Sequence, residues 1–183
     1  MIEFLGWLLL TLAMAAVIHV AAIWYIPTLF VWLLARKTRR DGTPVNAFGY
    51  GGVHSAPIGR NIATINPDLA IALGVYDVSK GPVRVTCHTP PVDTYWSVSL
   101  YASNTDNILL INDKAAKAPS FDLVIVDGKS KYQKMGDEEV VISPTPKGVA
   151  IVRVLVKDRE DEAALALIDQ VLRKTVMCPD QRT

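Results

Sequence analysis

The feature that most constrains this chain is an apolar run without a single charge over residues 4–35, "FLGWLLLTLAMAAVIHVAAIWYIPTLFVWLLA". About 20 apolar residues in a helix already span the hydrocarbon layer of a membrane, at roughly 1.5 Å per residue. A signal peptide is the competing interpretation, but no basic residue precedes the run, its apolar stretch is too long, and no small-residue cleavage site follows it. The sequence therefore predicts a transmembrane anchor that is retained.

The apolar run is longer than one membrane-spanning helix needs to be, so we divide it into two segments. As one helix it would measure about 48 Å, more than a straight span needs, and Pro27 removes a backbone donor near its end. We expect residues 4–26 to cross the membrane and residues 28–40 to turn along its interface. Aromatic residues prefer headgroup depth, where this division would place Trp24, Tyr25 and Trp32. The predicted organisation is an anchor and interfacial helix over 1–40, a Gly/Pro-rich linker over 41–66 and a sandwich domain over 67–183.

Charge leaves the orientation open. Four basic residues follow the run and only Glu3 precedes it, so the positive-inside rule would put the domain in the cytoplasm: Arg36, Lys37, Arg39 and Arg40. Against this, Cys87 and Cys178 form an even pair that an oxidising periplasm would join, and we predict a disulfide between them. The net charge of +1 gives no field for nucleic acid, which excludes it as an expected partner.

His19 lies in the middle of the apolar run. An ionisable side chain at that depth is a functional hypothesis, and a neutral imidazole there is able to ligate a haem iron or a chlorophyll magnesium. Small alanines surround it, which favours the plainer interpretation that His19 hydrogen-bonds a neighbouring helix. We predict no cofactor.

The remainder of the chain reads as strands separated by turns. Runs rich in Val, Ile, Leu and Tyr alternate with Gly, Pro, Asn and Asp clusters, which is typical of an antiparallel β-sandwich. The fold class is therefore mainly β, with strands expected over 70–76, 83–88, 95–102, 108–112, 123–126, 139–143 and 149–156. Residues 158–176 place apolar side chains on one face and predict a C-terminal amphipathic helix against the sheet or the linker.

Three segments together resemble a known family. "YDVSKGPVRV", "YWSVSLY" and the late "SPTPKG" hairpin are similar to the short membrane-anchored branch of the domain-of-unknown-function 1254 (DUF1254) family. The resemblance implies a β-sandwich, an inner-membrane anchor in bacteria, a periplasmic domain and a companion protein carrying domain of unknown function 1214. Longer relatives carry the segment "N-x-D-T-L-Y". This chain has Asn66, Pro67, Asp68, Leu69 and Ala70 there, so the threonine and the tyrosine of that segment are missing.

The search for chemistry finds no complete site. No Ser or Cys has a His base and a carboxylate in a recognisable arrangement, His54 beside Ser55 is only a sequence neighbour, and strand alternation would point Cys87 and His88 to opposite faces. No Cys or His spacing predicts zinc. The oxygen-rich segment over 103–107 is read as a turn rather than a calcium site. If a polar pocket exists, we expect six residues to converge at one end of the sandwich: Asp68, Tyr101, Asn104, Asn107, Asn112 and Asp113.

These observations favour a non-enzymatic envelope module, tethered to the lipid bilayer, that binds another membrane or envelope protein or serves as an accessory subunit. One alternative is a protein that holds a lipid or small apolar ligand between its sheets. Another is a hydrolase with an unrecognised site. A filled core favours the first, an empty apolar cavity the second, and paired titratable groups in a cleft the third.

Overall fold

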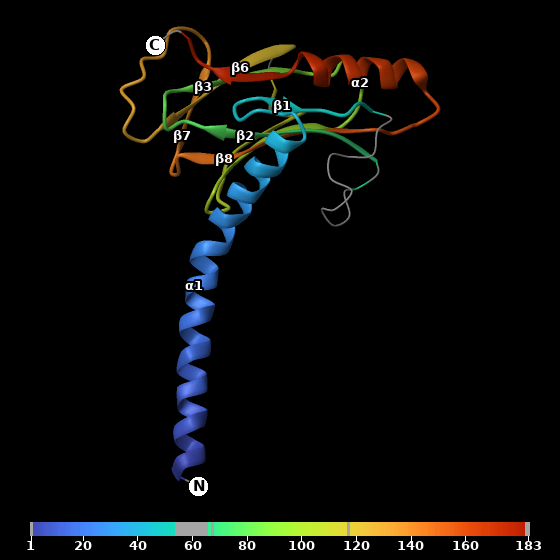
Figure 1. Cartoon of the computed structure of the whole chain (residues 1–183). Helices are drawn as coiled ribbons and strands as arrows, with labels where there is room; N and C mark the ends of the chain where they lie inside the picture. The colour runs from blue at the N-terminus through green and yellow to red at the C-terminus, as the bar shows by residue number, and fades with distance from the viewer. Residues whose placement is uncertain (1, 54–65, 67, 117, 182–183) are drawn as a thin grey trace.

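A computed structural model describes residues 2–53, 66, 68–116 and 118–181. It begins with α1, Ile2–Arg40, a helix of 39 residues that continues through Pro27. The expected break at Pro27 is therefore wrong: a proline removes one backbone donor, and the surrounding helical hydrogen bonds continue past it. Figure 1 shows α1 as one long rod whose axis changes direction in its upper part, near the domain.

The exposed surface of α1 is unusual for a helix in water. Its 18-residue window of highest hydropathy is 0% buried, and the helix over Glu3–Arg40 is long and apolar enough to cross a membrane. Length and composition alone are shared by membrane anchors and signal sequences. It is the one helix in the described part of the chain that meets these criteria.

Two β-sheets pack against each other to form the domain, as the sandwich prediction requires (Figure 1). The five-stranded sheet has the order β1-β2-β8-β4-β5 and the four-stranded sheet the order β7-β6-β3-β9. The strand bounds are β1 Phe48–Gly49, β2 Leu69–Asp77, β3 Val83–His88, β4 Trp96–Ala102, β5 Asn107–Asn112, β6 Ser120–Asp127, β7 Glu139–Ser143, β8 Lys147–Leu155 and β9 Val176–Pro179. β6 and β7 pair in parallel, so the sandwich is not purely antiparallel.

The core lies between the sheets and is filled by alternating side chains. Residues on one face of β2, β4 and β8 meet those on one face of β3 and β6, because successive strand residues point to opposite faces. Tyr76, Leu100 and Ile125 are fully buried there, and Trp96 meets Phe121 with ring centroids 6.1 Å apart. Gly148 is required for this packing, since a Cβ at that position would lie 2.2 Å from the Tyr76 hydroxyl.

The second helix, α2 (Glu162–Lys174), closes one edge of the sandwich. Asp161 caps its start, because its carboxylate accepts a hydrogen bond of 3.0 Å from the Ala164 amide. Its buried face contacts β2 of one sheet and β3 of the other, and consists of Leu165, Ile168, Val171 and Leu172. The predicted helix was longer at both ends; the chain after Lys174 instead forms β9, which pairs with β3.

The last turns of α1 pack onto the outer face of the five-stranded sheet. Val31, Leu34 and Ala35 are buried against a separate apolar cluster that includes Val75 and Val149. Thr38 is also buried. The end of the apolar helix is thus part of the domain, and the interfacial placement expected for residues 28–40 stays a prediction.

Candidate functional site

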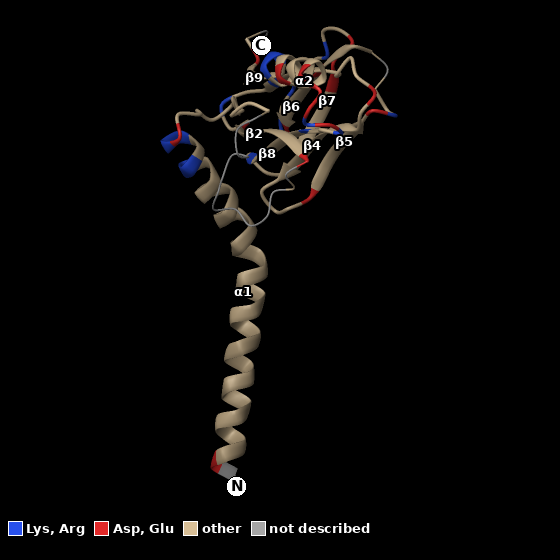
Figure 2. Ribbon diagram, turned by 90° about the vertical axis from the view of Figure 1, so that its right-hand side faces the viewer, with Lys and Arg blue, Asp and Glu red and all other residues tan. Residues whose placement is uncertain are grey.

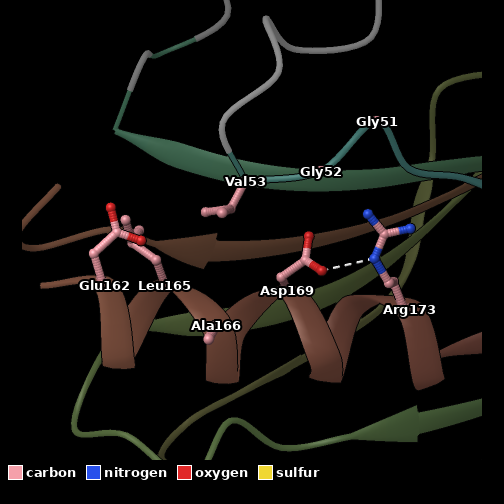
Figure 3. A pocket seen from close by; sticks show the side chains of 8 residues that line it. All are labelled: Gly51, Gly52, Val53, Glu162, Leu165, Ala166, Asp169 and Arg173. Atoms are coloured by element: carbon pink, nitrogen blue, oxygen red, sulfur yellow. Dashed lines mark hydrogen bonds and ion pairs between the residues drawn. The ribbon is translucent and has the colours of Figure 1, made fainter.

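A groove of about 540 Å³ runs along α2 (Figure 3). The backbone of the segment that follows β1 forms one wall, and one face of α2 forms the other. The α2 residues recur at helical spacing and therefore share a face. The lining residues are Gly51, Gly52, Val53, Glu162, Leu165, Ala166, Asp169 and Arg173.

The groove combines an apolar floor with a charged rim. Val53 and Leu165 are buried members of the main core, whereas Glu162 is exposed. On the rim, the Asp169 carboxylate accepts a hydrogen bond of 2.6 Å from the Arg173 guanidinium, one helical turn away. This bond holds the pKa of Asp169 below its ordinary value.

Tyr50 connects the charged rim to the domain. The Arg173 guanidinium lies 5.5 Å from the centre of the Tyr50 ring, within the range of a cation–π interaction. Burial, together with the nearby Asp169 charge, raises the pKa of the Tyr50 phenol above its ordinary value. Tyr50 is therefore a protonated phenol at neutral pH, not a base.

The described part of the groove presents charged and apolar groups to a ligand. Among the described residues, the groove lining contains two carboxylates and one guanidinium, and Asp169 is already ion-paired. Within the described residues, no group of three His, Cys, Asp or Glu could hold a metal ion. An apolar floor with a polar rim is also a feature of many protein–protein interfaces.

A buried charge cluster lies elsewhere, on the outer face of the four-stranded sheet. Arg84 of β3 donates to Asp122 of β6 at 2.9 Å and to Asp180, just after β9, at 2.9 Å. The side chains of Arg84 and Asp180 are only 8% and 2% exposed. Tyr132, which donates to the buried Glu138 at 3.1 Å, covers the cluster from the loop that precedes β7.

The cluster is held by mutual charge compensation. Burial alone would lower the pKa of Arg84, but hydrogen bonds and the charges of Asp180 and Asp122 raise it above its ordinary value. Sequence reasoning missed this cluster, because its members come from segments up to 96 residues apart. The one signal was an arginine among apolar residues in the "GPVRVTC" strand. The hydrogen bonds of the charge cluster hold β9 and the loop before β7 against the sheet.

A family model now decides the identity of the domain. It matches residues 45–177, described as a protein of unknown function, DUF1254. That range begins just before β1, contains both sheets and α2, and ends within β9. The chain belongs to the DUF1254 family.

One solved structure has a similar fold. The VPA0106 protein from Vibrio parahaemolyticus is similar with a TM-score of 0.65 at 18% identity over 89% of this chain. This chain spans 40% of that protein's length, so the likeness concerns the fold alone. An uncharacterized protein from Burkholderia cenocepacia has a TM-score of 0.44 at 13% identity, covering 61% of this chain and 32% of its own. No curated protein matches the chain.

The DUF1254 domain does not bring the six predicted pocket residues together. Asn107 and Asn112 lie at opposite ends of β5, about 17 Å apart at the rise of a strand. Tyr101 and Asn104 lie with the first end, while Asp68 and Asp113 lie with the second, because β2 and β4 start there. The prediction of one cluster is wrong because the chain reverses between β4 and β5. The end of β4 and the start of β5 therefore lie at one end of the sandwich, and the end of β5 lies at the other.

Most of these side chains have structural roles. The Asn104 amide donates to Asp106 at 2.6 Å, and the Asn112 side chain accepts from the Ala115 amide at 3.1 Å, as in ordinary Asx turns. The Tyr101 hydroxyl accepts from Arg153 at 3.2 Å. Asp113 lines a surface hollow of about 430 Å³ at its end of the sandwich, together with Asp93 and Trp96.

The predicted Cys87–Cys178 disulfide is absent, and both thiols are free. Cys178 pairs with Arg84 in the β3–β9 register, so it lies on the outer face, whereas Cys87 points into the core. Cys87 and His88 do alternate across β3, as expected for a strand. Burial raises the pKa of the Cys87 thiol to about 12, which makes it a poor nucleophile. His19 lies on the exposed part of α1, and His54 falls outside the described residues.

Proposed function

We propose that this DUF1254 protein is a non-enzymatic, membrane-anchored envelope module whose domain binds a partner protein. One observation carries the proposal: α1 is fixed to the domain at one end and exposes an apolar surface over the rest of its length. Val31 and Leu34 are buried in the domain, whereas residues 3–21 are all exposed. A lipid bilayer removes that apolar surface from water.

The junction between α1 and the sheet supports retention of the helix. Removal of a signal sequence within the apolar run would bring a new chain end close to Val31, Leu34 and Ala35, which belong to the domain's packing. A retained helix preserves these contacts. Carbonate extraction of membranes and the intact mass of the purified chain test this step: an integral protein with residues 1–30 present is expected, and a shorter soluble product would refute it.

We place the domain in the periplasm of a bacterial inner membrane, in the short anchored branch of the family. The resemblance of the strand segments to that branch supports this side, and the basic residues after the run oppose it. Reporter fusions at the C-terminus of the full chain distinguish the two: an alkaline phosphatase fusion is active only outside the cytoplasm, and a green fluorescent fusion only inside.

The groove along α2 is the proposed partner-binding surface. In Figure 1, α2 lies on the side of the domain away from the N-terminal end of α1, where a partner is not obstructed by the membrane. Its apolar floor supplies buried area and its paired charges supply specificity. A protein carrying domain of unknown function 1214 is the first partner to test, since the resemblance implies such a companion.

The two alternatives find less support. A carrier of lipid or small apolar ligands needs space between its sheets, and that interior is occupied by fully buried side chains such as Tyr76, Leu100 and Leu123. A hydrolase needs a nucleophile within reach of a base. Among the described residues, neither the groove lining nor Cys87 supplies such a nucleophile.

Matched substitutions on α2 test the binding surface. Ala166 lines the groove, while Ala163, one turn earlier and also exposed, does not. A photo-reactive amino acid at 166 is expected to crosslink the companion protein in intact cells, and the same group at 163 is not. Ala166→Arg should abolish copurification of the companion, with Ala163→Arg as the control. Equal behaviour of the two positions would refute the assignment of the groove.

A further inference from the structure

A basic hollow of about 420 Å³ lies where α1 meets the five-stranded sheet. Four cationic side chains line it, three from the last turns of α1 and one from the start of β8, and Figure 2 shows the blue basic cluster at that end of the helix. Its lining residues are Trp32, Ala35, Arg36, Arg39, Arg40, Val45 and Lys147.

The arginines of this hollow are not neutralised by the domain. Lys147 forms an ion pair with Asp77 at 3.4 Å. By contrast, within the described residues no carboxylate forms an ion pair with Arg36, Arg39 or Arg40. The Arg36 guanidinium instead lies 5.5 Å from the centre of the Trp32 ring. No acid is among the described residues that line the hollow, so it attracts an anion.

The length of the apolar run places the hollow at headgroup depth. Residues 4–35 carry no charge and extend about 48 Å as a helix. A tilt of about 20°, together with the change of axis direction near the domain, brings the span to no more than roughly 45 Å, the thickness of a bilayer including its headgroups. Glu3 and Arg36 then lie at the headgroup layers of opposite faces. Trp32, one turn below Arg36, lies where membrane aromatic residues prefer to be.

We propose that this hollow binds the phosphate group of an anionic phospholipid in the leaflet next to the domain. Guanidinium groups donate two parallel hydrogen bonds to phosphate oxygens, which a lysine does not match. Trp32 and Leu33, both exposed, lie on the membrane side of the arginines, where the acyl chains would begin. Because Val31 and Leu34 pack on the sheet, a bound headgroup fixes the domain against the membrane surface. This inference rests on the proposed membrane anchoring.

Lipid binding to the full chain tests the inference. The chain is purified in a non-ionic detergent, stripped of lipid and mixed with phosphatidylglycerol or phosphatidylcholine of identical acyl chains, and bound lipid is measured by native mass spectrometry. Phosphatidylglycerol should bind more tightly. The triple variant Arg36→Gln, Arg39→Gln, Arg40→Gln should weaken it by about fivefold for each charge removed, on the order of 100-fold in total.

A second set of variants separates position from net charge. Lys129→Gln, Lys131→Gln and Lys134→Gln removes the same charge from exposed residues of the loop before β7 and should leave binding unchanged. Replacing the three arginines with lysine keeps the charge without the planar fork and should give intermediate affinity. Circular dichroism melts of each variant check that the domain is folded.

The possible results have distinct meanings. Equal affinity for the two lipids, or an equal loss in both triple variants, overturns the inference. Full competition by millimolar inorganic phosphate would mean that the hollow recognises free phosphate rather than a lipid, which also overturns it. A chain that is released from membranes by carbonate refutes the anchoring itself, whereas an integral chain without lipid preference refutes only the headgroup site.

Discussion

Replacement of Arg84 by methionine should destabilise the domain far more than the same replacement at Arg173. Both arginines pair with aspartate, but the Arg84 side chain is 8% exposed and that of Arg173 is 60% exposed. Arg84→Met leaves Asp180, which is 2% exposed, without this guanidinium, and also removes the ion-pair partner of Asp122. Removing one partner from a buried ion pair costs about 3–5 kcal/mol, because a charge stays buried.

The exposed pair gives the contrasting expectation. Arg173 and Asp169 are one helical turn apart at the surface, and such pairs contribute about 0.2–1 kcal/mol. For a domain of this size, 1 kcal/mol corresponds to roughly 2–4 °C of melting temperature. Arg84→Met should therefore lower the melting temperature by about 6–20 °C, and Arg173→Met by less than about 4 °C.

Circular dichroism of the full chain in detergent measures both variants under one condition. The β-sheet signal must be followed, since α1 is expected to stay helical in the micelle. A further variant, Arg84→Met with Asp180→Leu, should recover part of the loss because it removes a buried carboxylate. If Arg84→Met and Arg173→Met lowered the melting temperature equally, the charge cluster would not be the buried, mutually compensated unit inferred here.

Three further predictions concern the cysteines, the core and pH. In the native protein without reductant, a thiol reagent should label Cys178 at once and Cys87 only after denaturation, because Cys87 is buried; a single disulfide-linked species would contradict this. Gly148→Val should prevent native folding, as judged by loss of the cooperative melt, since a side chain there meets Tyr76, whereas Gly128→Val, with only Ile142 at 3.6 Å, should be tolerated. Burial raises the pKa of Cys87 from 9.0 to about 12, so the stability that its neutral thiol contributes is full below pH 9 and is lost as pH rises toward 12. Urea midpoints between pH 8 and 11 should fall less steeply in Cys87→Ala than in the parent, and parallel curves would refute this. On the acid side, hydrogen bonds and nearby cations lower the pKa of Asp77 and Asp169 from 3.8, so their contribution is lost as pH falls below that value.

The strands were predictable where local patterns agreed with the final packing. Residues 83–88 and 139–143 form strands with the expected bounds, since short β-branched runs flanked by turn residues specify extended backbone. β9 was missed because the "VMCP" segment pairs only with β3, which is far away in the chain. Val176, for example, pairs with Thr86, 90 residues earlier. The parallel pairing of β6 with β7 was missed because the direction of pairing depends on the path of the connecting loop, which local composition does not specify.

The candidate site was less predictable than the fold. Glu162, Asp169 and Arg173 read simply as the polar face of a helix, and Gly51 and Gly52 as a linker. Their juxtaposition depends on α2 lying across the edge between the sheets, which is decided by Leu165 and Ile168 packing into the core. The predicted polar cluster failed on the same ground, because composition says which loops are polar and not which end of the sandwich each one reaches.

The sequence by itself determined the long apolar helix, the β-rich domain and the amphipathic helix, because these depend on hydrophobic periodicity and turn chemistry over a few neighbouring residues. Only the tertiary structure decided that the end of α1 packs on the five-stranded sheet, that Cys87 and Cys178 lie on opposite faces, and that Arg84 joins Asp122 and Asp180. Those relations are set by strand order and register, which arise from contacts between residues far apart in the chain.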